Sequence, residues 1–291
     1  MTKQFSPPVF YLFSCNISFI CESKGGFSGT IRYSTKEIMK KNQKSLANSV
    51  EICYTSIWII RGMDGGSFMR HFNIAVDGPS GAGKSTLSRR LAKRLRCIYV
   101  DTGALYRTIA LWMMREHAET DEEIKDKLPE LTVTMDYLDG EQHVFANGED
   151  VTALIRTEAV SMAASRVSAL PAVRKFLFRL QQSLAEQNSV VMDGRDIGTV
   201  VLPDADVKIF LTASPEKRAM RRFLELEQKQ PGAQTFESVL EDVIRRDEHD
   251  MNRKISPLKQ AEDAVPVDTS DAGLEESEQM LFQICKEKLG L

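Results

Sequence analysis

The sequence lacks the features that mark membrane, secreted and metal-binding proteins. Its five cysteines are scattered, with no Cys-x-x-Cys pair and no metal-ligand spacing to the four histidines. An odd number of scattered cysteines predicts reduced thiols in a cytoplasmic protein. The apolar stretch 9–20 is interrupted by Ser14, Asn16 and Ser18 and is too short to cross a membrane. The residues after it, 21–24, form a poor signal-peptide cleavage site.

The chain also lacks a strong net charge and two recognition patterns. Its net charge of −3 implies no general surface for polyanions. Residues 1–68 carry +4, so the remainder carries −7, without interleaved aromatic and basic residues. We therefore expect no nucleic-acid partner. A GTP-binding switch would need an Asn-Lys-x-Asp guanine reader, and the sequence contains no Asn-Lys dipeptide.

Residues 1–68 differ from the rest of the chain. They show no clear period of 2 or 3.6, and their centre, 36–44, is a basic polar run. Three interpretations remain open: a disordered tail, a basic targeting or interaction arm, or a segment that is not translated. The last follows from Met69, which lies four residues before the first predicted strand. The sequence thus predicts an extension over 1–68 and a domain over 69–291.

The residues that are present include one strong motif, Gly78–Ser85, which fits G-x-x-x-x-G-K-[ST]. The apolar run 73–77 before it predicts a strand, and leucines at helical spacing in 86–95 predict a helix, so the context is that of a phosphate-binding loop. Lys84 would reach the β- and γ-phosphates, and Ser85 would bind Mg²⁺. Backbone amides and the helix start favour anionic phosphates. The predicted ATP-binding residues are Gly78, Pro79, Ser80, Gly81, Ala82, Gly83, Lys84, Ser85 and Thr86.

Apolar runs alternate with amphipathic segments along the rest of the domain. Further strands are predicted at 97–101, 189–193, 206–212 and 264–268. Helices are predicted at 104–114, 121–128, 152–167, 171–187, 215–228, 236–250 and 274–289. This alternation predicts an α/β fold of the P-loop NTPase type, a parallel sheet with helices on both faces. Asp139-Gly140 predicts a hairpin between 131–137 and 142–146, and Pro266 predicts that the last strand is short or near an edge of the sheet.

Several residues in this arrangement suit phosphate chemistry. Asp77, Asp101 and Asp193 follow predicted strands, at the sheet edge where ligands bind. Asp193 suits a Mg²⁺ site together with Ser85. Arg107 and Arg195 lie beside strand ends and glycines, and an arginine can bind a phosphate through two hydrogen bonds. Other arginines lie on predicted helices, where an ordinary surface position is an equal alternative: Arg174, Arg218, Arg221, Arg222, Arg245, Arg246 and Arg253.

Four motifs taken together resemble the bacterial cytidylate kinase family: 78–86, 101–107, 193–201 and 246–253. The resemblance extends from about Met69 to the C-terminus, and residues 1–68 have no counterpart in it. It implies a kinase that transfers the γ-phosphate of ATP to CMP or dCMP with the help of Mg²⁺. It also implies a nucleotide-binding insert over about 102–175 and a lid over about 215–250. Other small-molecule kinases on this fold, those of adenylate, thymidylate or shikimate, are the alternatives, and the acceptor pocket discriminates between them.

The resemblance also implies a role for each matching residue. Lys84, Arg107 and Arg195 would be catalytic, the two arginines by holding the acceptor phosphate. Arg218 and Arg222 would belong to the lid over ATP. The CMP site would be formed by residues that read the cytosine (Thr102, Arg174, Asp196 and Arg253) and residues that hold the sugar (Ser165, Arg246 and Asp250). We expect a monomer whose substrates are the two nucleotides.

The cytosine-reading role of Asp196 is chemically consistent. A carboxylate can accept a hydrogen bond from the exocyclic amino group of cytosine, and an arginine can donate to its O2 or N3. Uracil would place a carbonyl oxygen against Asp196 instead. The sequence therefore predicts a preference for CMP over UMP.

Overall fold

The computed structural model describes residues 16–22, 28–34, 71–138 and 140–291. The chain divides into two compact units, Met1–Met69 and Arg70–Leu291. In the first unit, strands β1 (Asn16–Glu22) and β2 (Ser28–Ser34) pair antiparallel, and neither strand was predicted. The rest of 1–68, for which disorder or absence of translation was among the interpretations, lies outside the described residues.

The second unit is built on a parallel sheet. Among the described residues it has five strands in the order β10-β9-β3-β8-β4, and each neighbouring pair is parallel. The predicted parallel sheet is therefore confirmed, and Pro266 does lie in an edge strand. The strands are β3 (Asn73–Asp77), β4 (Ile98–Asp101), β8 (Val190–Gly194), β9 (Val207–Thr212) and β10 (Val265–Asp268).

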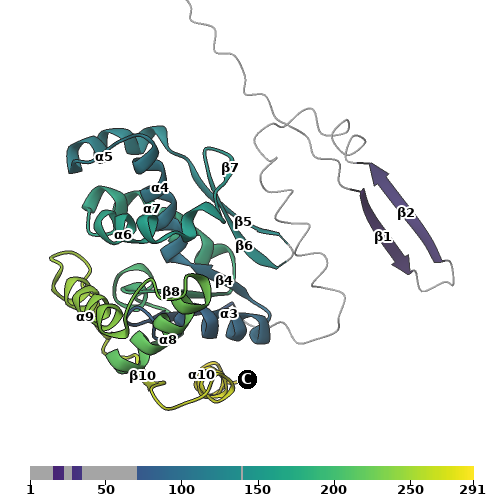
Figure 1. Cartoon of the computed structure of the whole chain (residues 1–291). Helices are drawn as coiled ribbons and strands as arrows, with labels where there is room; N and C mark the ends of the chain where they lie inside the picture. The colour runs from purple at the N-terminus through teal and green to yellow at the C-terminus, as the bar shows by residue number, and fades with distance from the viewer. Residues whose placement is uncertain (1–15, 23–27, 35–70, 139) are drawn as a thin grey trace, which may run out of the picture. The chain divides into compact units, whose positions relative to one another are not determined.

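Helices cover both faces of this sheet (Figure 1). Alternate residues of a strand point to opposite faces. Ile74 and Val76 of β3 thus pack with α3 (Lys84–Leu95) and α10 (Leu274–Leu289). Ala75, between them, packs with α7 (Pro171–Gln187) and the π-helical turn η3 (Ile197–Val201). Each large aliphatic side chain buried in this way contributes about 1.5–3 kcal/mol.

A separate group of elements follows β4, within the range predicted for the insert. The antiparallel hairpin is confirmed, and a third short strand that was not predicted pairs with it. The helix predicted over 152–167 begins only at Glu158, because the Thr157 side chain accepts a hydrogen bond from the backbone N–H of Val160 and caps the helix there. The elements are α4 (Thr102–Arg115), α5 (Asp121–Lys127), η1 (Leu128–Glu130), β5 (Val133–Leu138), β6 (Glu141–Ala146), β7 (Glu149–Asp150), η2 (Leu154–Arg156) and α6 (Glu158–Val167).

The predicted lid region contains two helices, α8 (Pro215–Lys229) and α9 (Phe236–Asn252). They pack through a small core of Ala219, Val239 and Val243, with the rings of Phe223 and Phe236 edge to face at 6.3 Å between centroids. Across the described ranges of the chain, we find no helix with the length and apolar character needed to span a membrane.

Candidate active site

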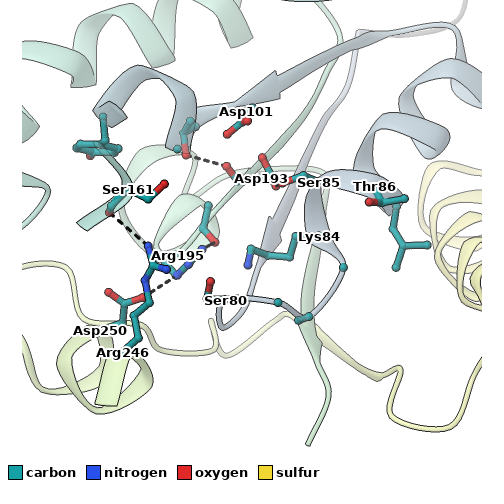
Figure 2. Close-up of a pocket in the computed structure, with 18 of the residues that line it drawn as sticks. Ser80, Lys84, Ser85, Thr86, Asp101, Ser161, Asp193, Arg195, Arg246 and Asp250 are labelled. Carbon is teal, nitrogen blue, oxygen red and sulfur yellow. Dashed lines mark hydrogen bonds and ion pairs between the residues drawn. The ribbon is translucent and has the colours of Figure 1, made fainter. Parts of the chain in front are cut away.

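The phosphate loop lies between β3 and α3 and closes around Lys84 (Figure 2). The Lys84 ammonium donates a hydrogen bond to the Pro79 carbonyl at 2.6 Å, and its side chain is buried. Gly78 has a φ of +148°, and a Cβ there would lie 1.9 Å from the carbonyl oxygen of Leu211 in β9. A residue with a side chain cannot occupy this position, so the first glycine of the motif lets the loop leave the sheet.

Lys84 shares its buried site with carboxylates and another cation. Burial lowers the pKa of Lys84, and the guanidinium of Arg195 lowers it further, while Asp193 and Asp77 act in the opposite sense. Burial also raises the pKa of Asp193, assisted by the nearby charge of Asp101. A bound polyphosphate would favour the charged form of Lys84 by supplying the negative charge that its buried position lacks.

Oxygen atoms that suit a magnesium ion meet at the end of β8. The Ser85 hydroxyl donates to Asp193 Oδ2 at 2.8 Å, and the Tyr99 hydroxyl donates to Oδ1 at 3.2 Å. The described residues contain no group of three or more His, Cys, Asp or Glu side chains that could hold a metal ion. Mg²⁺ commonly binds through one or two protein oxygens, with phosphates and water completing its shell. Ser85 and Asp193 fit that arrangement.

The loop forms one side of a cleft of about 550 Å³, a volume typical of small-molecule sites. Most of the predicted site residues line it. The exceptions are Gly78, Pro79 and Arg218. The predicted residues that do line the cleft are Ser80, Gly81, Ala82, Gly83, Lys84, Ser85, Thr86, Thr102, Arg107, Ser165, Arg174, Asp193, Arg195, Asp196, Arg222, Arg246, Asp250 and Arg253.

The two arginines predicted to hold the acceptor phosphate are paired with carboxylates. Arg107 donates to Asp101 Oδ2 at 2.9 Å, and Arg195 donates to Asp250 Oδ2 at 2.9 Å. Burial works to raise the pKa of Asp250, but the charges of Arg195 and its neighbouring arginines outweigh burial and hold that pKa below its usual value. Both guanidinium groups therefore lie in the cleft, and the charge of Arg195 also acts on Lys84.

The residues predicted to read the base form one polar cluster. Arg174 donates to Asp196 and, through Nη1, to the Ser168 carbonyl at 3.1 Å. Arg253 donates to the Ser168 hydroxyl at 3.3 Å. Burial raises the pKa of Asp196, while the charges of Arg174 and Arg253 partly offset this effect. The Tyr106 ring lies 5.8 Å from the Arg174 guanidinium carbon. The cluster presents one carboxylate between two guanidinium groups.

The residues predicted to hold the sugar lie on α6 and α9. Ser165 and Arg246 line the cleft with Asp250. Arg246 donates to the Ser161 carbonyl at 3.4 Å and so connects α9 to α6 (Figure 2). Burial lowers the pKa of Arg246, and the positive charge of Arg195 adds to this effect. Two segments more than 80 residues apart in the chain are thus joined at the cleft.

Comparison with known proteins agrees with these motifs. A sequence model described as cytidylate kinase matches residues 74–287. The chain belongs to the cytidylate kinase family. A cytidylate kinase of Caldicellulosiruptor saccharolyticus is 46% identical over 224 residues, which cover 76% of this chain and 99% of the relative. One of Carboxydothermus hydrogenoformans is 48% identical over 217 residues, covering 74% and 97%. The resemblance inferred from the four motifs is confirmed.

Within this member of the cytidylate kinase family, Asp77 lies at the carboxyl end of β3, as expected. It does not line the cleft, however. Its buried carboxylate accepts hydrogen bonds from the backbone N–H groups of Ile197 at 2.8 Å and Gly198 at 2.7 Å. Burial raises the pKa of Asp77 to about 6. Asp77 therefore fixes the backbone that follows Arg195 and Asp196.

Arg218 does not line the cleft either. It lies behind the phosphate loop, where its guanidinium bonds to Ser80 and Asp247. Arg221 and Arg222, one turn further along α8, line the cleft instead. Positions 221 and 222 lie on nearly the same helix face as Arg218, so the difference comes from the partners of the Arg218 side chain, which Ser80 and Asp247 hold away from the cleft.

Sequence reasoning missed several residues at this cytidylate kinase site. Tyr99 was assigned only to a strand, yet its hydroxyl contacts Asp193. Tyr106 lies within a recognised motif, and that motif could have identified it. Arg156 of η2 donates to Asp101 at 3.3 Å, and the Gln142 side chain accepts from the Asp101 backbone N–H at 2.7 Å. No local pattern marks the last two, because the folding of the insert alone brings them to β4.

Proposed function

We propose that this protein transfers the γ-phosphate of ATP to CMP or dCMP, giving CDP or dCDP and ADP. The observation that carries the proposal is the meeting of two groups in one cleft. The phosphate loop with Lys84 lies on one side, and the cluster of Arg174, Asp196 and Arg253 lies on the other. Membership of the cytidylate kinase family supports this choice of acceptor.

The proposed acceptor site reads cytosine by its amino group. The Asp196 carboxylate accepts from the exocyclic amine, and a guanidinium of Arg174 or Arg253 donates to O2 or N3 of the ring. Thr102 completes the base site. Ser165, Arg246 and Asp250 hold the sugar. A base with a carbonyl at the amine position would face the Asp196 carboxylate and be disfavoured, and this discriminates cytidylate from uridylate.

The proposed transfer depends on positioning and on positive charge. Lys84 holds the β- and γ-phosphates of ATP, while Arg107 and Arg195 hold the acceptor phosphate in line with the γ-phosphate. Ser85 and Asp193 would hold Mg²⁺, which when bound would neutralise charge on the transferred group. Arg107 and Arg195 exchange a carboxylate for the phosphate when the acceptor binds. Closure of α8 and α9, with Arg222, would exclude water and limit hydrolysis of ATP.

A steady-state screen of nucleoside monophosphates with ATP and Mg²⁺ tests the proposal. ADP formation is followed for CMP, dCMP, UMP, AMP, dTMP and shikimate. We expect CMP and dCMP to give the highest kcat/KM. Faster turnover of any other acceptor would overturn the proposed function, and the CMP to dCMP ratio would show how strongly the sugar is read.

We further propose that the enzyme acts in the cytoplasm as a monomer, without a nucleic-acid partner. The scattered cysteines and the net charge of −7 on residues 69–291 support this proposal. Sedimentation at micromolar concentration tests the monomer, and a gel shift with RNA at physiological salt tests the absence of nucleic-acid binding.

A further inference from the structure

We propose that the buried ion pair between Arg218 and Asp247 positions the phosphate loop, so that Arg218 is a positioning residue and not an ATP ligand. Arg218 comes from α8 and Asp247 from α9. The inference rests on the proposed function only in taking ATP as the donor nucleotide.

The Arg218 side chain is buried and held by three hydrogen bonds within the protein. Only 3% of Arg218 is exposed. Nε donates to the Ala213 carbonyl at 2.8 Å, Nη1 to the Ser80 carbonyl at 3.1 Å and Nη2 to Asp247 Oδ2 at 2.6 Å. Its guanidinium therefore joins the end of β9, the phosphate loop and α9. Because Arg218 does not line the cleft, its side chain would have to move and rearrange these bonds to contact ATP.

The bond to Ser80 controls a phosphate-binding amide. The Ser80 carbonyl and the Gly81 N–H belong to one planar trans peptide, so they point in opposite directions. Holding the carbonyl toward Arg218 turns the Gly81 N–H away from Arg218. Gly81, with a φ of +75°, has no side chain to oppose a flip of this peptide. Arg218 thus supplies the restraint that the glycine lacks.

The pair also connects the two sides of the cleft. Asp247 lies on α9 between Arg246 and Asp250, which both line the cleft on the proposed acceptor side. Within the described ranges, Asp247 Oδ1 has no hydrogen-bond partner, and Asp247 forms no ion pair except the one with Arg218. Removing Arg218 alone would leave a buried, uncompensated carboxylate on the helix that carries the acceptor site.

The decisive variant removes both charges together. A buried ion pair can be replaced by apolar residues of similar size without loss of stability, whereas removal of one partner is strongly destabilising. We therefore expect Arg218→Met combined with Asp247→Leu to melt close to the wild-type temperature. Its affinity for ATP, measured by calorimetry without any acceptor, should fall about tenfold, the change expected from one hydrogen bond to a charged group.

Two single variants complete the test. Asp247→Asn keeps the shape of the side chain and weakens its hold on Arg218, so it should lower ATP affinity in the same direction by a smaller factor. Lys217→Gln is the matched control, because Lys217 is the neighbouring exposed cation of α8, paired with Asp271 at 3.0 Å. It should leave ATP affinity unchanged.

Three results would overturn the inference. Wild-type ATP affinity in the double variant would show that the pair positions nothing. Loss of ATP affinity in the double variant with none in Asp247→Asn would show that Arg218 contacts ATP directly and does not act through Asp247. An equal loss of ATP affinity in Lys217→Gln would show that the effect comes from removing any positive charge from α8. A wild-type protein that binds ATP but does not phosphorylate CMP would overturn the proposed function and leave this test valid.

Discussion

The donor and acceptor sides of the cleft are built in different ways. The donor side comes almost entirely from one segment, 78–86, whose backbone forms the cradle for phosphate. The acceptor side draws on residues between Thr102 and Arg253, carried by α4, α6, α7, α9 and the loop after β8. A phosphate tail can be held by local amides, whereas a base and sugar need side chains from several directions. The two halves should therefore respond differently to substitution.

The largest effect should come from the one side chain essential to the donor half. Lys84→Ala should lower kcat by roughly 10²–10³-fold, because the transferred phosphate loses its buried cation. The fold should persist, since the variant removes a buried charge rather than a packing group; thermal melting checks this. Lys93→Ala, an exposed lysine on the same helix, is the control and should retain full activity. Near wild-type turnover of Lys84→Ala would refute the phosphate role.

Substitutions in the acceptor half should change the preference for CMP over UMP more than they change kcat. Asp196→Ala should raise the KM for CMP and reduce the CMP to UMP preference about 10–100-fold, because the groups that distinguish the amine from a carbonyl are lost. The ratio of kcat/KM for the two nucleotides measures it. Asp204→Ala, an exposed carboxylate eight residues later, should leave the ratio unchanged. An unchanged ratio in Asp196→Ala would remove Asp196 from base recognition.

Asp77 connects the two halves and should show a pH signature. Its folded pKa is raised from 3.8 to about 6 by burial. The stability it contributes is therefore fully present below about pH 4 and is lost as pH rises through about 6. The difference in unfolding free energy between wild type and Asp77→Asn should fall by about 1 kcal/mol from pH 5 to pH 7.

Asp263→Asn is the matched control for that titration. Its carboxylate, paired with Lys208 outside the cleft, has a lowered pKa. The stability that Asp263 contributes is lost only below pH 5. The difference in unfolding free energy between wild type and Asp263→Asn should therefore stay constant between pH 5 and pH 7. Urea unfolding at both pH values gives the measurement, and a flat difference for Asp77→Asn would contradict the assignment.

The smallest effect should come from the segment outside both halves. Starting the chain at Met69 should leave kcat, both KM values and the melting temperature unchanged, because the family match begins at residue 74. A fall in rate or solubility would show that residues 1–68 support the enzyme. Intact-mass measurement of the native protein tests their translation directly: a mass that begins at Met1 would reject the interpretation that they are not made.

Much of this fold was predictable because its signals are local. The strand at 73–77 and the helix at 274–289 were predicted with the bounds that the structure has. The start of α6 was wrong by six residues, because one side chain, Thr157, decides where that helix begins. The motifs predicted most of the cleft lining. They did not show that the Arg218 side chain turns away from the cleft, since helical spacing shows which residues share a face but not which partners each side chain meets.

The sequence by itself determined the phosphate loop, the parallel α/β architecture and the family, since these depend on backbone conformation and on the order of apolar and polar residues within short segments. Only the tertiary structure decided which carboxylate faces which arginine, that Asp77 holds the 197–198 backbone, and that Arg218 lies behind the loop. The last two pairings join residues far apart in the chain: Asp77 and Gly198 are 121 positions apart, and Arg218 and Ser80 are 138 positions apart. A buried charge must be paired, and the tertiary fold determines which residue pairs with it, so no local sequence pattern predicts the partner.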